Sequence, residues 1–500
     1  MRLKPTAEQN AAIDLSMTGA SFKVIARAGS GKTSLLDMIA HTKGNTRGVY
    51  LVFGRDNAAE AKRKLPKSVS ASTFHSLAHR SLPAGITGKV NNAMETTDLL
   101  SGRMGLKSIA VPSVLGRTVE LRGSDLAQMV NDAAVRFCKS ADDAPSVDHI
   151  EVNPIIERRA MEQLRGELLP YVEVLWEEFC SPKSPYRIGH DVYLKIWQLS
   201  SPEIEGRYIM LDEGQDSDDV MLSILQGQYH AQVIYVGDPY QQIMEFRGSV
   251  DAMQRIEAPE VYLTQSFRFG RSIADLASLV LRKLGESTPI RGQDSISSVV
   301  IDEEAENFVY PFKAVLCRTN ATAVAQMADE LRAGKRVALR ANTSEILNFC
   351  GASRQLMCGM SPASPSALTL FQDWLEVCDY AETFAGREIK PYVKLINDIG
   401  PDMLEEMVGA SVPLLYADMV ISTAHKAKGL EFKSVRVEGD FRFYTDEETG
   451  KVEMTPEETR LLYVTLTRAR EWLDIYAIQG QLKAMLADAG IIGSREDSLM

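Results

Sequence analysis

The sequence predicts an α/β fold with parallel sheets, arranged as two domains that are each interrupted by a mostly helical insertion. Short apolar segments alternate with helical patterns in the first 80 residues and again in the last third of the chain. Such alternation is typical of a parallel sheet with crossover helices. Two intervening stretches, at about 86–200 and 346–412, lack strands at regular spacing. The length of 500 residues agrees with about three or four globular units and excludes a single small binding module.

Each predicted element follows from a local pattern. Apolar runs predict buried strands at 22–26, 48–53, 208–211, 232–236, 314–317, 419–422 and 434–437. Helical patterns occur at 34–39, from the second strand through residue 64, and at 124–137 and 154–179 within the first insertion. The expected domains are therefore 1–85 with 201–265 and 266–345 with 413–500, and the expected insertions are 86–200 and 346–412.

The charge is distributed unevenly along the chain. The formal net charge is −12, yet residues 1–90 carry 14 Lys and Arg against 5 Asp and Glu. Either the surface charge is simply uneven, or one basic working face belongs to an otherwise acidic body. The six cysteines form no CxxC pair, no apolar run approaches about 18 residues, and Met1 leads into a polar segment. We therefore expect a cytoplasmic protein without disulfides, a metal cluster, a membrane span or a secretory signal.

A phosphate-binding loop is predicted at 26–33, where Ala-Arg-Ala-Gly-Ser-Gly-Lys-Thr follows a strand and opens a helix. The glycines let backbone N–H groups curl around phosphate oxygens, and the helix N-terminus adds partial positive charge. Lys32 is expected to reach the β- and γ-phosphates, and the Thr33 hydroxyl to ligate Mg²⁺. The general pattern begins with Gly, and Ala26 takes that place here. The alternative to a phosphate-binding loop is a Gly-rich turn with a purely structural role. The expected nucleotide contacts are Ala28, Gly29, Ser30, Gly31, Lys32, Thr33 and Ser34.

Two carboxylates follow the strand predicted at 208–211. We expect Asp212 to hold Mg²⁺, directly or through water, and Glu213 to polarise the attacking water as a general base. A strand that ends in Asp-Glu is often only a solvated turn. Because a phosphate-binding loop needs an acidic partner for its metal, the two motifs together predict an enzyme that hydrolyses a nucleotide with Mg²⁺.

The segment Asp-Glu-Gly-Gln-Asp at 212–216 resembles the DExQD box of superfamily 1 helicases of the UvrD/Rep type. Further motifs of that family are matched in the same order, by residues 6–9, 72–76, 236–248, 263–268, 423–432 and 457–469. Residues 190–199 and the run 237–270 are similar to the F-box DNA helicases. The resemblance implies two RecA-like motor domains that clamp Mg²⁺-ATP between them, with 1B-like and 2B-like insertions.

The resemblance also implies roles for residues around the nucleotide. Gln9 would read the adenine edge and Phe267 would stack on its face, although Gln9 could equally be a helix-surface residue. Arg268 and Arg468 match the arginine fingers of the second motor, where guanidinium groups stabilise the charge on the γ-phosphate. The family match adds two further residues: a γ-phosphate sensor at Gln241 and a ribose-proximal carboxylate at Glu431.

A set of DNA contacts is implied by the same motifs, and it comprises Arg55, Thr73, Phe74, His75, Phe246, Arg247 and His425. Phe246 replaces the tryptophan common in the family, but any aromatic face can stack a base. Without the motif context, an aromatic residue is more often part of the core, and His425 could be a structural histidine.

The function implied by the resemblance is an ATP-dependent translocase on single-stranded DNA and a DNA helicase, with 3′→5′ polarity. The alternative is a DNA-stimulated ATPase that displaces proteins, or that works within a repair or defence complex without processive unwinding of its own. The expected partners are single-stranded or partly duplex DNA and a possible protein of a larger complex, with nucleoid association in a prokaryote. Only 25 residues precede Ala26, so we expect no F-box and no ubiquitin-ligase partner.

Overall fold

Two six-stranded parallel sheets organise the computed structural model, which confirms the predicted α/β class. The structure describes residues 4–91, 95–114, 116–243, 252–303, 313–362, 368–383, 386 and 389–494. Phe246 and Arg247, two of the predicted DNA contacts, lie outside these residues. No helix in the described part of the chain is both long and apolar enough to cross a membrane.

The first sheet has the strand order β3-β2-β6-β7-β1-β8. Its strands are β1 (Phe22–Ala26), β2 (Gly48–Leu51), β3 (Val69–Ser72), β6 (Tyr208–Leu211), β7 (Gln232–Gly237) and β8 (Glu260–Leu263). All residues of β1, β2, β6 and β7 are buried, as expected for parallel strands that are covered on both faces. The accompanying helices are α1 (Ala7–Ser16), α2 (Lys32–Thr42), α3 (Arg55–Lys64), α4 (Phe74–Ser81), α10 (Asp219–Gln226) and α11 (Ala252–Arg255), with the 3₁₀ turns η2 (Gly214–Asp216) and η3 (Pro239–Gln241).

The first insertion is mostly helical, as predicted, but it also contains an antiparallel hairpin. Its elements are α5 (Ala84–Thr87), α6 (Thr97–Met104), β4 (Ile109–Pro112), β5 (Thr118–Leu121), α7 (Gly123–Phe137), η1 (Val147–His149), α8 (Arg158–Cys180) and α9 (His190–Leu199). The buried side chains of α7 and α8 pack into one continuous core with the neighbouring face of the first sheet.

The second sheet has the strand order β11-β12-β10-β13-β16-β9. Its strands are β9 (Val299–Ile301), β10 (Ala314–Cys317), β11 (Val337–Arg340), β12 (Met419–Thr423), β13 (Phe432–Val437) and β16 (Ala469–Asp474). Around it lie α12 (Arg271–Lys283), α13 (Asn320–Arg332), α18 (Pro456–Leu466), η7 (Tyr476–Ile478), α19 (Gln479–Asp488) and the hairpin of β14 (Tyr444–Thr445) and β15 (Val452–Glu453). The second insertion consists of α14 (Thr343–Met357), α15 (Trp374–Ala381), α16 (Lys390–Ile399) and α17 (Pro401–Gly409), followed by η6 (Leu414–Tyr416).

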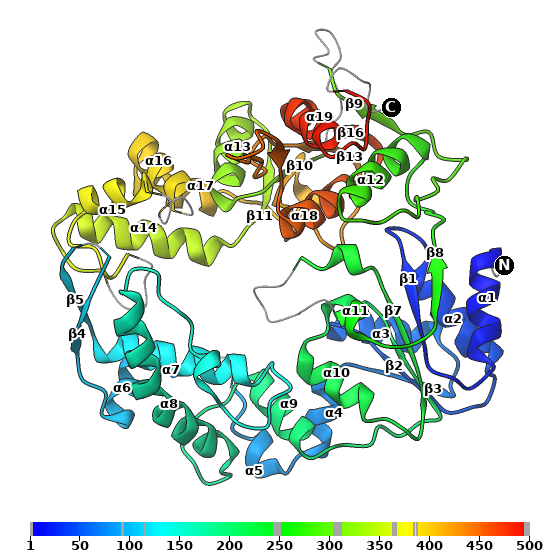
Figure 1. Ribbon diagram of the computed structural model, residues 1–500, viewed down its shortest axis with the longest axis horizontal. Helices are drawn as coiled ribbons and strands as arrows, with labels where there is room; N and C mark the ends of the chain where they lie inside the picture. The colour runs from blue at the N-terminus through cyan, green and yellow to red at the C-terminus, as the bar shows by residue number, and fades with distance from the viewer. Residues whose placement is uncertain are drawn as a thin grey trace.

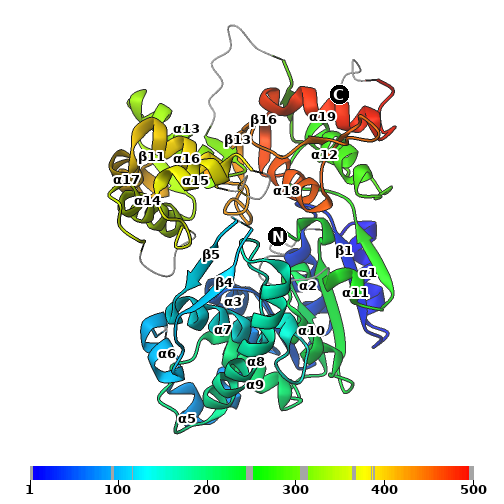
Figure 2. The same cartoon turned by 60° about the vertical axis from the view of Figure 1, so that its left-hand side comes forward.

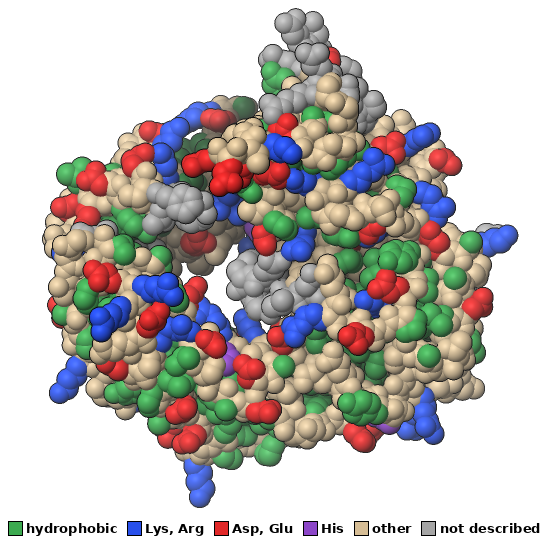
Figure 3. All heavy atoms as spheres, in the orientation of Figure 1, with side chains coloured by type: hydrophobic (Ala, Val, Ile, Leu, Met, Phe, Trp, Pro, Cys, Tyr) green, Lys and Arg blue, Asp and Glu red, His purple; other side chains and the backbone are tan. Residues whose placement is uncertain are grey.

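The two insertions meet on the side of the molecule opposite to the contact between the sheets (Figures 1 and 2). The β4–β5 hairpin reaches the second insertion, where Arg117 Nη2 lies 2.8 Å from Glu376 Oε1 and 2.9 Å from Oε2. The same nitrogen donates to the backbone oxygen of Leu370 at 3.0 Å. Figure 3 shows an opening through the middle of the molecule, so the four parts form a ring.

Candidate active site

The phosphate-binding loop lies between β1 and α2, as the sequence predicts. Gly29 and Gly31 have φ values of 73° and 78°, a left-handed conformation that glycine adopts without steric cost. A side chain at Gly29 would place its Cβ 2.6 Å from Arg268 Cβ. The loop therefore has close contact with the segment that enters the second motor.

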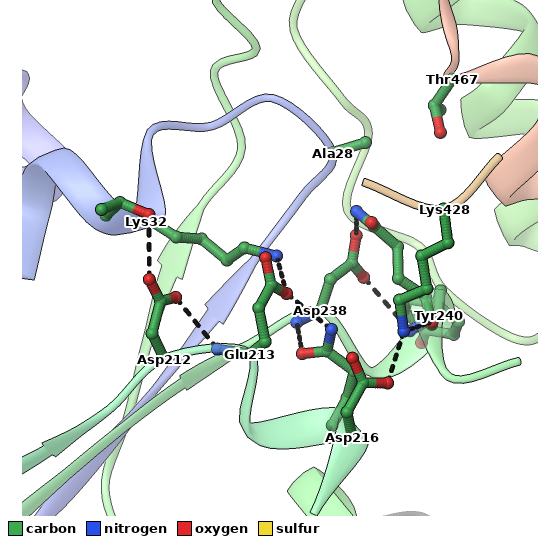
Figure 4. A network of polar contacts seen from close by, with 12 residues as sticks. Ala28, Lys32, Asp212, Glu213, Asp216, Asp238, Tyr240, Lys428 and Thr467 are labelled. Atoms are coloured by element: carbon green, nitrogen blue, oxygen red, sulfur yellow. Dashed lines mark hydrogen bonds and ion pairs between the residues drawn. The ribbon is translucent and has the colours of Figure 1, made fainter. Parts of the chain in front are cut away.

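Asp212 directly follows β6 and lies beside the start of α2 (Figure 4). Its Oδ2 accepts hydrogen bonds from Thr33 Oγ1 at 2.9 Å and from the Tyr50 hydroxyl at 2.6 Å. Burial, and then the charge of Glu213, raise the pKa of this carboxyl. Asp212 is only 3% exposed, so its orientation is fixed by these two donors.

Glu213 is held in a left-handed backbone conformation, with φ of 54°, which is uncommon for a residue with a side chain. Its Oε2 accepts from Lys32 Nζ at 2.6 Å and from Gln215 Nε2 at 2.7 Å. Burial alone would raise the pKa of this carboxyl, but Lys32 and Gln215 bring it down to about 2. Glu213 is therefore ionised at neutral pH, as a general base must be.

The two arginines predicted as fingers come from opposite ends of the second motor and lie side by side. Arg268 Nε donates to Glu431 Oε1 at 2.7 Å, and its Nη1 donates to the backbone oxygen of Thr467 at 3.1 Å. Arg468 is buried, with Nε donating to the backbone oxygen of Val464 at 2.8 Å. Burial, and then the adjacent Arg268 cation, lower the pKa of Arg468, so a nearby anion would stabilise the pair.

A cavity of about 680 Å³, here called the cleft cavity, is bordered by both motors. From the first motor it is lined by Gly29, Ser30, Gly31, Lys32, Thr33, Ser34, Phe53, Asn57, Glu213, Asp216 and Gln241. From the second motor it is lined by Phe267, Arg268, His425, Lys426, Lys428, Gly429, Glu431 and Arg468. Most of the residues predicted to contact the nucleotide are thus brought together around one cavity.

Three predicted nucleotide residues lie outside this lining, each with partners of its own. The Ala28 amide donates to the Tyr463 hydroxyl at 3.1 Å, and Asp212 lies behind Thr33. Gln9 is 4% exposed, and its side-chain oxygen accepts from the Thr6 amide at 3.0 Å in the capping box of α1.

Gln9 and Phe267 nevertheless approach the same end of the phosphate-binding loop. A Cβ at Gly31 would lie 3.5 Å from Gln9 Nε2 and 3.6 Å from the Phe267 ring. The Phe267 ring is 45% exposed. An amide nitrogen and an accessible aromatic face therefore meet at Gly31, which is the combination that a purine base needs.

A hydrogen-bond network links the segment 212–216 and its neighbours in the first motor to the second motor (Figure 4). Lys428 pairs with Asp216 and donates to the backbone oxygen of Gln241 at 2.8 Å. Gln241 Nε2 donates to Asp238 Oδ2 at 2.7 Å, and the Tyr463 hydroxyl donates to the same oxygen at 2.9 Å. The predicted sensor Gln241 is therefore in direct contact with the second motor.

A second, smaller pocket of about 330 Å³ lies between the first motor and helix α9 of the first insertion and is here called the His75 pocket. It is lined by Val52, Phe53, Gly54, Arg55, Thr73, Phe74, His75, His190, Tyr193 and Met221. Four of the predicted DNA contacts are thus gathered at one place. His425 lies instead at the cleft cavity, where burial, and then Arg318, lower its pKa to about 4.

The residues of the His75 pocket differ in how accessible their side chains are to a ligand. Phe74 is 2% exposed and belongs to the core, and the Thr73 hydroxyl accepts from the Ser76 amide at 3.1 Å as the cap of α4. The rings of His75 and His190 lie 6.2 Å apart in an edge-to-face arrangement. The accessible face of the pocket is therefore formed by histidines and by Arg55, rather than by the Phe74 ring.

Several residues of both sites were not identified from the sequence. Tyr50, Asp238 and Tyr463 are buried, and their hydroxyl and carboxylate groups orient Asp212, Gln241 and the loop. Lys428 and Tyr463 lie within the motif V and motif VI segments, so the motif context could have identified them. Tyr50 carries no such signal, since it reads as one more residue of a buried strand.

The residues present fit a bound Mg²⁺. The Thr33 hydroxyl and the Asp212 carboxylate are hard oxygen ligands, which Mg²⁺ prefers. Within the described ranges, no group of three or more His, Cys, Asp or Glu side chains is placed to hold a metal ion. Thr33 and Asp212 are the residues that would hold the ion, and Mg²⁺ beside phosphates commonly has one or two protein ligands.

Comparison with known proteins agrees with the motif order. A family model for the UvrD-like helicase C-terminal domain matches residues 375–480, and a model described as an AAA domain matches residues 9–247. F-box DNA helicase 1 of Gallus gallus is 28% identical over 515 residues, which cover 94% of this chain and 48% of that protein. F-box DNA helicase protein 1 of Schizosaccharomyces pombe (strain 972 / ATCC 24843) is 26% identical over 512 residues, which cover 94% of this chain and 57% of that protein.

This chain therefore spans about half the length of the relatives that it matches. Both family models fall on the segments that build the two sheets and the cleft cavity between them. Taken with the ordered motifs and the paired parallel sheets, these matches support a UvrD/Rep-like superfamily 1 helicase.

Proposed function

We propose that this protein is an ATP-driven motor that moves along single-stranded DNA in the 3′→5′ direction and unwinds duplex DNA. One observation carries the proposal: a single cavity is lined by Lys32 and Glu213 from the first motor and by Arg268 and Arg468 from the second. Chemistry that needs all four side chains can proceed only while the two motors are in contact.

The chain supplies complementary groups for hydrolysis of the γ-phosphate. Glu213, ionised and directed by Lys32 and Gln215, would take the proton of the attacking water. Lys32, Arg268 and Arg468 would stabilise the negative charge on the transferred phosphoryl group, and such arginines are worth about 10³–10⁵ in rate. Thr33 and Asp212 would hold a Mg²⁺ ion, whose charge would offset part of the negative charge of the phosphates.

Coupling to DNA would run through the network that spans the motors. Gln241 lies at the cleft cavity and contacts Lys428 of the second motor. It directly precedes the segment that contains Phe246 and Arg247. A change at the γ-phosphate would therefore reach the proposed DNA path through a short stretch of chain.

The second candidate function is a DNA-stimulated ATPase that displaces proteins without processive unwinding of its own. The observation that favours it is the small size of the second insertion, in which the described residues form four α-helices between Thr343 and Gly409. Strand displacement on partial duplexes with 3′ or 5′ tails, run beside displacement of a DNA-bound protein, separates the two functions and tests the polarity.

The direct test is ATP hydrolysis with single-stranded DNA, duplex DNA, forked DNA and RNA as stimulating cofactors. Lys32→Ala and Glu213→Gln should reduce DNA-stimulated turnover by at least about 10²-fold, since each removes a group that acts on the γ-phosphate. Glu205→Gln is the matched control, because Glu205 is exposed and away from the cleft cavity. Wild-type turnover in either site variant would contradict the assignments, and stimulation by RNA alone would contradict DNA as the substrate.

A further inference from the structure

A buried ion pair crosses from the phosphate-binding loop to the second motor, outside the cleft cavity. Arg27 follows β1 directly and is 0% exposed. Its Nη2 pairs with Glu286, which lies 259 residues further along the chain. Neither residue lines the cleft cavity, and neither is part of the hydrolytic machinery described above.

The end of α12 fixes the position of Glu286. Gly285 has φ of 82°, and its amide donates to the backbone oxygen of Arg282 at 3.0 Å. The Glu286 amide donates to the backbone oxygen of Leu281 at 3.1 Å. These two bonds form a Schellman motif, which ends a helix in a defined geometry. The Thr288 amide donates to the remaining carboxylate oxygen at 2.7 Å, so the carboxylate is preorganised before it meets Arg27.

The surroundings of Arg27 keep it charged and leave it dependent on Glu286. Its guanidinium lies 5.1 Å from the centre of the Tyr240 ring, a favourable cation–π arrangement. Burial alone would lower its pKa, but Asp238, Tyr463 and Glu286 together raise it. Within the part of the chain that the structure describes, Nε and Nη1 of Arg27 are buried without a hydrogen-bond partner. Asp238 therefore shares in balancing this charge, and Glu286 is the carboxylate that accepts a hydrogen bond from Arg27.

We propose that Arg27 and Glu286 are a positioning pair that sets the phosphate-binding loop against the second motor, so that the loop is aligned with the arginines of that motor. The inference rests on the proposed function, because its main readout is ATP turnover. The adjacent residue supports the same reading, since the Ala28 amide is held by the Tyr463 hydroxyl of the second motor. The loop is therefore attached to the second motor at two consecutive residues, through the side chain of Arg27 and the backbone amide of Ala28.

The physical signature of such a pair is strong non-additivity. Removal of one partner leaves an uncompensated buried charge, whereas replacement of both by apolar side chains of similar volume is often neutral. Glu286→Met leaves the buried Arg27 cation without the carboxylate that it hydrogen-bonds. Arg27→Met instead leaves a carboxylate that still accepts a hydrogen bond from the Thr288 amide. The first variant should therefore be the more damaging.

The experiment is a double-mutant cycle of Arg27→Met, Glu286→Met and the combined variant. Steady-state ATP hydrolysis is measured with an oligo(dT) cofactor, and apparent Tm is measured on the same samples. Glu286→Met should lower kcat by at least about tenfold and lower the Tm, and the double variant should return kcat to within about threefold of wild type. The KM for ATP should change by less than about threefold, because the cleft-lining residues of the loop remain. Glu260→Met is the control, since Glu260 pairs with Lys23 within the first sheet at 2.9 Å.

Each outcome has a defined meaning. Wild-type kcat in Glu286→Met, or additive losses in the double variant, would overturn the positioning role. If Glu286→Met does not fold, Arg27→Met and the double variant still decide whether an apolar pair supports turnover. If the wild-type chain itself shows no DNA-stimulated hydrolysis, the proposed function fails, and the Tm cycle alone then shows whether the two charges are coupled across the motors.

Discussion

Substitution of Gly29 by alanine should distinguish two effects: a loss of ATP turnover caused by a disturbed contact between the motors, and a loss of stability caused by backbone strain in the loop. The Gly29 backbone is left-handed, its oxygen accepts from the Phe267 amide at 2.8 Å, and an added Cβ would lie 2.6 Å from both Arg268 Cβ and Ser266 Oγ. The Arg268 Cβ belongs to the base of its side chain and cannot rotate away. The methyl group would therefore have to push the backbone of this segment.

The size of the effect follows from two contributions. A left-handed alanine costs about 1–2 kcal/mol. Carbon atoms are in favourable contact at about 3.5–4.0 Å, so a contact of 2.6 Å requires Arg268 to move by roughly 1 Å. A displacement of that size in a catalytic group can cost about 10²-fold in rate. We therefore expect a modest loss of stability and a large loss of kcat.

Gly19→Ala supplies the matched control. Gly19 has φ of 84°, and an added Cβ would meet nothing within 4 Å, so this variant carries only the backbone strain. Gly29→Ala should lower the apparent Tm by at least as much as Gly19→Ala, and only Gly29→Ala should lose about 10²-fold in DNA-stimulated ATP turnover. Equal and near-wild-type turnover in the two variants would refute the reasoning that the loop and Arg268 must keep this spacing.

Three further outcomes follow from single contacts. Tyr50→Phe removes one donor from the Asp212 carboxylate, a contact of about 1.5–3 kcal/mol, and should raise the Mg²⁺ concentration needed for half-maximal ATPase; an unchanged Mg²⁺ titration would contradict it. Burial raises the pKa of Asp218 to about 6, so the stability linked to its proton is complete below about pH 4 and is lost as the pH rises through 6. Asp218→Asn, which keeps a side-chain oxygen to cap α10, should therefore raise the Tm more at pH 8 than at pH 4, and a pH-independent difference would count against this linkage. A covalent cross-link between cysteines that replace Arg117 and Glu376 should suppress ATPase stimulation by circular single-stranded DNA but not by linear DNA, if the strand passes through the opening in Figure 3; equal stimulation would place the strand elsewhere.

Every strand that was predicted from the sequence has neighbours on both sides, although β16, which lies between β13 and β9, was not predicted. All seven predicted strands were found, and each lies inside a sheet with both faces covered. Parallel strands in that position read as continuous apolar runs. The four sheet edges, β3, β8, β9 and β11, were not predicted. In β3 and β8 only part of each strand is buried, so the apolar signal on which the prediction depends is too weak at an edge.

In the candidate site, residues that act within one continuous segment could be predicted from the sequence, whereas contacts between distant segments could not. The phosphate-binding loop and the Asp212–Glu213 pair were identified because strand, turn and helix are consecutive in the chain. The partners of Arg27 and Asp216 come from residues more than 200 positions away. No periodicity or spacing encodes such a pairing, because it depends on how two separately folded sheets meet.

Pairing between residues that are distant in the sequence also explains part of the basic excess of residues 1–90. Lys23, Arg27 and Lys32 are largely buried, and each pairs with a carboxylate from beyond that segment, namely Glu260, Glu286 and Glu213. Three of the 14 cations of this segment are therefore balanced within the fold by the acidic remainder of the chain. Exposed cations such as Arg55, at the His75 pocket, remain available to a phosphate backbone. The two interpretations of the charge were thus not exclusive: part of the excess is paired inside the fold, with Arg27–Glu286 joining the motors, and part stays exposed on the first motor.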